Sequence, residues 1–421
     1  MRKFFEIFRL QWRALARSGA FAALLVASVA WMLVLPRIMH GDGTEYGEFA
    51  MQVRYSLGIV FSLSVVALSA SAAGSIAAER EARRLQLTMV RPVRLFAVAL
   101  ARVAAITAAG AAVLAIAAAT LWFQVGRGRT CDHALSPILE SPETAADRMF
   151  DDYMKRYPDF REKVEETGEG EMRRYLAQYV RDSYQTVSTN ESASWSFDLS
   201  GFGGSRDYSV RVRMTDLFGR LKDVAGTFSV NGRAGDLGNV SKTLVAVPLS
   251  REIRTDEDRV DVLSFANTGT TSVTIYPRRD LQLLVRADSF AWNLFRAWLE
   301  LVAVLALVVA VGVFLGASLS RPVAVFVMIS LLFVAVVTPS TVENCPDPTT
   351  TTAADRVGLA ISRFSAAATS PFYAYGPVGA LEDGTCVEWS EVGEALATDG
   401  VFIPLVLSLL AGLVMSRRES V

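Results

Sequence analysis

The sequence has few of the side chains on which most enzyme active sites depend. Its 421 residues include only two histidines and three cysteines. Neither the H-E-x-x-H pattern of zinc peptidases nor the G-x-S-x-G pattern of serine hydrolases occurs in it. Residues 125–289 contain 23 basic and 26 acidic residues, a mixed surface and not a basic groove for nucleic acid. We therefore predict no catalytic, metal, cofactor or nucleic-acid site in this chain.

Nucleotide-binding motifs are missing as well. A phosphate-binding loop needs G-x-x-x-x-G-K-[ST], and the nearest stretch, 235–243 (GDLGNVSKT), lacks the Gly-Lys pair in register. The stretch 198–204 (DLSGFGG) is similar to the signature of an ABC ATPase, but it lies among alternating, strand-like residues and has no phosphate-binding loop to work with. Any ATP hydrolysis is therefore expected in another polypeptide, and this chain is predicted not to be an enzyme.

Long apolar runs are what the sequence has instead. A helix needs about 20 mainly apolar residues to cross the hydrocarbon core of a bilayer. Six runs meet this length, and they lie at 18–37, 55–78, 95–124, 290–318, 322–340 and 400–416. The first run is too long for the apolar part of a signal peptide. The chain is therefore predicted to cross a membrane six times.

The short loops differ in charge, and this difference predicts the orientation. Residues 1–17 hold five Lys or Arg and one acid, and residues 78–94 hold five Arg and two Glu. Residues 40–54 hold three acids and one Arg, and residues 341–399 hold nine acids and two Arg. Since loops rich in Lys and Arg stay in the cytoplasm, we expect both termini to be cytoplasmic at the plasma (inner) membrane. Residues 125–289 and 341–399 are then extracytoplasmic.

All three cysteines fall in segments predicted to lie outside the cytoplasm, where disulfides are permitted. Cys345 and Cys386 share one loop, so they are the pair that we expect, and Cys131 would then be free. Three cysteines allow three pairings, and the sequence by itself leaves the other two open.

The long segment 125–289 changes its period along the chain. Ser141, Pro142 and Glu143 form a helix start, and the segment 131–190 is predicted to be helical. Apolar and polar residues alternate through 193–288, with Gly, Asn and Asp between the runs, as in short antiparallel strands. We expect a helical cap followed by an antiparallel β-sandwich.

The fold class is therefore an α-helical integral membrane protein with six transmembrane helices and an extracytoplasmic α+β insert between the third and fourth. Residues 1–17 and 353–368 are amphipathic, and we expect each to lie along the bilayer surface. The predicted layout is an interfacial helix at 1–17, three spans at 18–124, the insert at 125–289, two spans at 290–340, a loop at 341–399 and the last span with a tail at 400–421.

Three charged residues fall within the apolar runs, where a charge is expensive and often functional. Arg102 lies two turns from the cytoplasmic end of its span, so its side chain can extend to the membrane surface. Arg296 and Glu300 are four residues apart on one helix face and are expected to form an ion pair. Structural anchoring and a role in a translocation path are the two interpretations of this pair.

The segment 79–94 is charged, helix-prone and joined directly to the second and third spans. It begins Glu79-Arg80-Glu81 and runs to Pro92-Val93, and it resembles the ABC-2 family of transporter permeases. Members of this family, which belong to the type V exporters, commonly read E-R-E-x-G-T-L-E-L-L-L-x-T-P-V after the second span. This chain matches at both ends and at two leucines, and it departs where Arg83-Arg84 replaces Gly-Thr.

The resemblance implies that 79–94 is a coupling helix, which docks on a cytoplasmic ABC ATPase subunit. The residues that it assigns to this contact are Glu79, Arg80, Glu81, Arg83, Arg84, Leu85, Leu87, Arg91 and Pro92. It also implies a second permease copy or a paralogue as dimer partner. The function expected from it is the membrane-spanning permease subunit of an ABC exporter.

Two other classes of function remain open on the sequence. One is a membrane receptor or scaffold that does not transport and whose extracytoplasmic β-sandwich binds an envelope partner or a ligand. The other is a membrane-embedded enzyme, which the scarcity of histidine argues against. The genes beside this one would distinguish a permease from a receptor or scaffold, because only a permease needs an ATPase.

Overall fold

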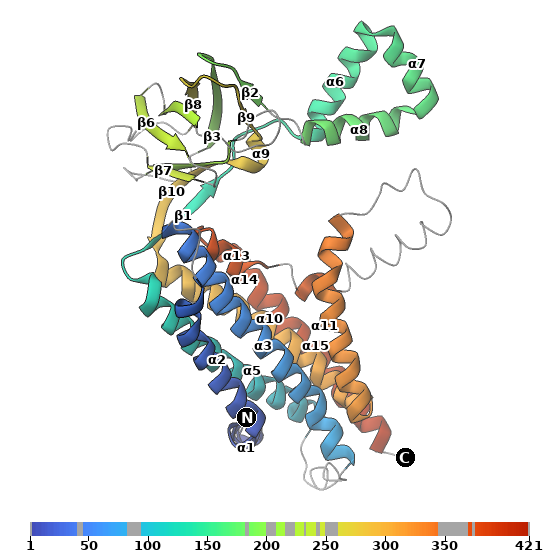
Figure 1. Ribbon diagram of the computed structural model, residues 1–421. Coiled ribbons are helices and arrows are strands. Elements are labelled where there is room, and N and C mark those ends of the chain that lie inside the picture. The colour runs from blue at the N-terminus through green and yellow to red at the C-terminus, as the bar shows by residue number, and fades with distance from the viewer. Residues whose placement is uncertain are drawn as a thin grey trace. The chain divides into compact units, whose positions relative to one another are not determined.

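The computed structural model describes residues 2–39, 45–81, 94–181, 185–198, 208–214, 224–230, 233–240, 245–248, 260–343, 369–372 and 375–419 (Figure 1). The chain forms two compact units. The first unit consists of Met1–Cys131 and Asp288–Val421, and the second unit consists of Asp132–Ala287.

The first unit contains five helical segments that are long and apolar enough to cross a membrane. They are Gly19–Ile38, Gly47–Glu79, Leu95–Gly126, Phe290–Ser318 and Trp389–Arg417. The elements that form them are α2 (Gly19–Ile38), α3 (Glu45–Glu81), α5 (Leu95–Leu121) with the π-helical turn η1 (Trp122–Gly126), α10 (Phe290–Ser318), and α14 (Trp389–Ala395) with the π-helical turn η5 (Leu396–Phe402) and α15 (Ile403–Glu419).

The predicted fifth span falls on helix α11 (Arg321–Glu343). Within the described side chains its apolar part, Arg321–Val337, is shorter than the other five. These five helices fit a multi-pass membrane protein, and the crossing by α11 stays a prediction.

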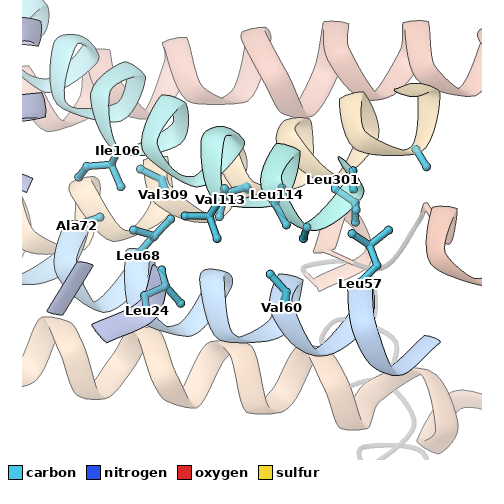
Figure 2. Close-up of a cluster of buried hydrophobic side chains, with 14 of the residues drawn as sticks. Leu24, Leu57, Val60, Leu68, Ala72, Ile106, Val113, Leu114, Leu301 and Val309 are labelled. Atoms are coloured by element: carbon cyan, nitrogen blue, oxygen red, sulfur yellow. The ribbon is translucent and has the colours of Figure 1, made fainter. Parts of the chain in front are cut away.

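Helix α10 is the centre of the first unit. Most of its residues are buried, and it packs against α3, α5, α15 and η5. Figure 2 shows Leu301 and Val309 of α10 in one apolar cluster with Leu68 of α3 and Leu114 of α5. An amphipathic helix with a single apolar stripe needs one partner. From Leu301 to Ala317, α10 is apolar on all sides and can be surrounded.

Small residues let α10 approach α3 closely. A Cβ built on Gly312 would lie 2.8 Å from the backbone oxygen of Ser69, and one built on Gly316 would clash with the backbone oxygen of Ala73. The G-x-x-x-G pattern of α10 is therefore used within the chain, since it brings two backbones together. Gly412 of α15 packs in the same way on Phe96 of α5.

Both ends of the chain lie at the end of the helical bundle where α3 ends and α5 begins (Figure 1). The amphipathic helix α1 (Arg2–Ala16) ends there, and the Ser18 side chain caps α2 by accepting a hydrogen bond of 3.2 Å from Phe21 N. The predicted surface helix at 1–17 is thus present as a helix.

The segment 131–190, which was predicted to be helical, is only partly so. Its stretches in Thr130–Leu135 and Gln185–Val187 are strands, because they pair with strands that come later in the chain. The part between them contains three helices. They are α6 (Pro142–Arg156), α7 (Pro158–Thr167) and α8 (Glu169–Arg181). Ser141 Oγ accepts a hydrogen bond of 3.1 Å from Thr144 N, so it caps α6 as expected. Phe150, Val164 and Leu176, one residue from each helix, form a small apolar core.

The strands of the second unit form antiparallel sheets. They are β1 (Thr130–Leu135), β2 (Gln185–Val187), β3 (Ser192–Asp198), β4 (Tyr208–Val212), β5 (Val224–Val230), β6 (Arg233–Val240), β7 (Val245–Pro248), β8 (Val260–Asn267), β9 (Val273–Ile275) and β10 (Leu281–Ser289). Two four-stranded sheets have the orders β1-β10-β4-β7 and β3-β8-β5-β6, and β2 pairs with β9. The short helix α9 (Pro277–Asp280) precedes β10.

Both four-stranded sheets contribute to one hydrophobic core. Phe197, Phe228 and Phe265 come from β3, β5 and β8, while Val210 and Leu283 come from β4 and β10. The register pairs Phe228 with Phe265, and Val210 with Leu283, so large apolar side chains meet across the strands. The alternation seen in the sequence therefore does mark strands with one buried face.

The disulfide differs from the predicted one. Cys386 is bonded to Cys131, with their Cα atoms 5.3 Å apart, and Cys345 lies outside the described residues. The pairing of Cys386 with Cys345 was wrong because it assumed that cysteines of one loop meet. In the structure Cys131 and Cys386 are both neighbours of the start of α10, since Phe290 N donates to Arg129 O and Asn293 Nδ2 donates to Thr385 O.

Candidate functional site

The end of helix α3 carries two glutamates of the charged motif, and each contacts a different helix. Glu79 Oε2 accepts a hydrogen bond from Arg102 Nη2 of α5 and forms an ion pair with it. The Arg102 side chain is 3% exposed, and that of Glu79 is 33% exposed. Arg102 is therefore paired with a residue of α3. This differs from the sequence prediction, in which its side chain extends to the membrane surface.

This ion pair matters to Arg102 more than to Glu79. Arg102 Nε and Nη1 are buried, and neither has a hydrogen-bond partner among the described residues. A buried guanidinium without a counter-charge is strongly destabilising. Glu79 thus provides the charge that allows Arg102 to lie inside the helical bundle.

Glu81 contacts the start of helix α11. Its Oε1 accepts a hydrogen bond of 3.1 Å from the backbone N of Arg321, the first residue of α11. The first N–H groups of a helix have no partner within the helix and attract negative charge. The Arg321 side chain also lies over α3, since a Cβ built on Gly74 would be 3.7 Å from its Nε.

Glu79 and Glu81 therefore connect α3 to α5 and to α11. We call these four residues, Glu79, Arg102, Glu81 and Arg321, the helix clamp. Its two glutamates lie immediately before residue 82, at the end of α3, and α5 begins at Leu95. The other residues assigned to the coupling segment lie outside the described part of the chain: Arg83, Arg84, Leu85, Leu87, Arg91, Pro92 and the side chain of Arg80. The predicted surface helix at 353–368 lies outside it too.

The predicted ion pair between Arg296 and Glu300 is wrong. Arg296 Nη2 pairs with Asp288, and its Nη1 donates a hydrogen bond of 2.8 Å to Val387 O. Glu300 Oε1 is buried and has no hydrogen-bond partner in the described structure. The reason is that the segment at Val387 packs against this face of α10, so Arg296 binds Val387 O and Asp288 in place of Glu300.

A polar stripe on α10 holds the segment around Cys386. Asn293 donates a hydrogen bond of 2.7 Å to Thr385 O and accepts one of 2.7 Å from Val387 N. Together with Arg296 these contacts satisfy the backbone on both sides of the disulfide. Asn293, Arg296 and Glu300 are spaced three and four residues apart, a signal of one polar face that the sequence carries within an apolar run.

Among the described residues of the second unit, Asp132 has a carboxyl group with a shifted pKa. Burial raises the pKa of the Asp132 carboxyl, while the positive charges of Arg211, Arg286 and His133 act to lower it. Within the described residues no three His, Cys, Asp or Glu side chains are grouped so as to hold a metal ion.

Comparison of the chain with protein-family models, with curated proteins and with solved structures found no match. The functional conclusion therefore rests on the residues and the contacts described above.

Proposed function

We propose that this protein is the membrane permease subunit of an ABC transporter, an exporter driven by a separate cytoplasmic ATPase. The helix clamp is the observation that carries the proposal. A coupling segment must pass a movement of the ATPase to the helices that line a translocation path. Glu79 and Glu81 are suited to this task, because they tie the end of α3 to α5 and to α11 directly before the charged segment.

The packing around the clamp supports the transmission of a movement. Gly316 of α10 contacts Ala73 of α3 closely, less than two turns before Glu79. Gly412 of α15 contacts Phe96 at the start of α5. Close-packed helices move together because no space is left between them. A displacement of residues 82–93 would then be felt by α3, α5, α10, α11 and α15.

In the proposed topology, the clamp and both termini face the cytoplasm at the plasma membrane. The Arg-rich residues 78–94 and the positive charges of residues 1–17 support this orientation. The disulfide between Cys131 and Cys386 supports an extracytoplasmic location for the opposite loops. The second unit would then be extracytoplasmic, and α11 would provide the sixth crossing.

A second permease copy or a paralogue is part of the proposal. The G-x-x-x-G face of α10 is occupied by α3, so a partner must use another surface. Helix α11 offers one. Its apolar residues Phe326, Phe333 and Val336 are 71%, 70% and 79% exposed. Lipid covers whatever part of this face the partner leaves free.

The test of the proposal is charge reversal in the coupling segment. The triple variant Arg83→Glu, Arg84→Glu and Arg91→Glu is compared with Arg174→Glu, an exposed arginine of α8. We expect the full-length chain to co-purify from cross-linked cells with a protein that carries a phosphate-binding loop, and the triple variant to lose it. The purified chain alone should hydrolyse no ATP. Unchanged association of the triple variant would refute the coupling assignment.

The second candidate function is a receptor or scaffold that binds an envelope partner or ligand. It is favoured by the second unit, which forms a compact body with its own apolar core. This function predicts that no ATPase gene lies beside this one and that the triple variant behaves like wild type. An adjacent ATPase gene together with loss of association in the triple variant would exclude it.

A further inference from the structure

Two buried carboxyl groups of the first unit each have an oxygen without a hydrogen-bond partner among the described residues. Glu300 of α10 is 1% exposed, and Asp399 of η5 is 2% exposed. Glu300 Oε1 and Asp399 Oδ2 are inaccessible to solvent, and neither atom has a hydrogen-bond partner in the described part of the chain. The nearest arginine along α10, Arg296, is committed to Asp288 and to Val387 O.

The two carboxyls belong to one contact between helices. Helix α10 packs on η5, and a Cβ built on Gly400, the residue after Asp399, would lie 3.6 Å from Ala303 Cβ. Ala303 is three residues beyond Glu300 and so lies on the same face of α10. Both acids act to raise the pKa of the Tyr375 phenol by electrostatic repulsion, so Tyr375 is near both of them.

The other groups around this contact are acidic or neutral. The negative charge of Glu391 of α14 disfavours a negative charge on Glu300, and that of Glu394 of α14 disfavours one on Asp399. The Thr398 side chain shares a hydrogen bond with Tyr375 and one with Asp399, and its Oγ1 lies 2.7 Å from Glu394 O, to which it donates. Burial raises the pKa of the Tyr375 phenol, so it is a neutral group at neutral pH. No described cation forms an ion pair with either buried acid.

The backbone at Asp399 is also unusual. Residues Leu396–Phe402 form a π-helical turn inside the helical segment that begins at Trp389. Such a turn widens the helix by one residue and is frequent at functional sites.

A buried carboxylate without a counter-charge, one of whose oxygens accepts no hydrogen bond, is disfavoured in its ionised form and is neutralised instead. Binding a proton achieves this with no further ligand. A metal ion would need more donors, and the described residues hold no group of three His, Cys, Asp or Glu arranged for one. We propose that Glu300 and Asp399 form a proton-binding site, in which each carboxyl holds a proton while α10 and η5 are packed and releases it when they separate.

Labelling with dicyclohexylcarbodiimide tests the site, because this lipid-soluble reagent adds to protonated carboxyls in apolar surroundings. The full-length chain in lipid vesicles is treated across a range from mildly acidic to alkaline pH, and labelled peptides are identified by mass spectrometry. We expect adducts at Glu300 and Asp399 whose yield falls as the pH rises. The exposed acids Glu391 and Glu394 are the internal controls and should stay unlabelled. Absence of adducts at both buried acids, or labelling equal to the controls, would overturn the proposal.

Thermal unfolding gives an independent measurement. Glu300→Gln and Asp399→Asn imitate the protonated acids, so both variants should fold. The Tm of the wild type should fall with rising pH, and the double variant should lose most of this dependence. If sodium chloride raises the Tm of the wild type but not of the double variant, relative to choline chloride, the site binds a metal cation and the proton assignment is wrong. Neither readout involves an ATPase, so the outcome is separate from that of the proposed function.

Discussion

Replacing Glu79 by Gln should destabilise the protein much more than replacing Arg102 by Met. In Glu79→Gln the Arg102 side chain, which is 3% exposed, stays buried and loses its counter-charge. In Arg102→Met the buried charge is removed, and Glu79, which is 33% exposed, can be hydrated by water at the end of α3. The two single variants break the same ion pair, so any difference between them measures the burial of the arginine.

The expected magnitude follows from the exposure of the two partners. Removing one partner of a fully buried ion pair costs about 3–5 kcal/mol. Glu79 is one-third exposed, and helices that are unfolded within a membrane still find polar partners, so we take about half of this range. The loss for Glu79→Gln is then about 2 kcal/mol, or roughly 30-fold in the unfolding equilibrium. Arg102→Met should cost about 0–1 kcal/mol, because methionine fills the same apolar space.

The assay is reversible unfolding in mixed detergent micelles, followed for the wild type, both single variants and the double variant. The double variant should resemble Arg102→Met, because the second change removes the charge that the first left unpaired. The coupling energy of this double-mutant cycle is therefore about the loss for Glu79→Gln. Equal losses for the two single variants, or strict additivity in the double variant, would show that the ion pair does not stabilise the end of α3.

Three further predictions follow from the same contacts. Gly316→Ala should lower the unfolding free energy by about 1–3 kcal/mol, because its Cβ would clash with a backbone oxygen of α3, whereas Gly379→Ala meets no atom within 4 Å and should be neutral in the same detergent unfolding assay. Mass spectrometry under non-reducing conditions should recover a peptide pair joined by Cys131 and Cys386, and a cross-link of either to another cysteine would contradict the pairing. The raised pKa of Asp132 means that its folded form binds a proton more tightly than its unfolded form, so its contribution to stability is present at low pH and is lost as the pH rises from the unfolded value of 3.8 through the folded one. Asp132→Asn should remove that part of the dependence of Tm on pH, and an unchanged slope would refute the assignment.

The sequence determined which parts of the chain are long apolar helices. The run at 290–318 coincides with α10, and the break at Pro158 separates α6 from α7, because span length and proline chemistry act locally. Alternation marked strands such as β3 and β8. Strand β10 departs from strict alternation, because its consecutive residues Leu283, Leu284 and Val285 are all buried.

Only the tertiary structure decided which side chains meet. Cys131 and Cys386 are 255 residues apart, and Glu81 lies 240 residues from its partner Arg321. A periodic pattern tells which face of a helix is buried, but it carries no information about which other helix covers that face. Even the local pair of Arg296 and Glu300 depended on the fold, because the choice of Arg296 between Glu300 and Asp288 was settled by the segment at Val387 packed against α10. The apolar helices can thus be predicted from the sequence. The contacts of the helix clamp and the burial of the two acids depend on how those helices pack.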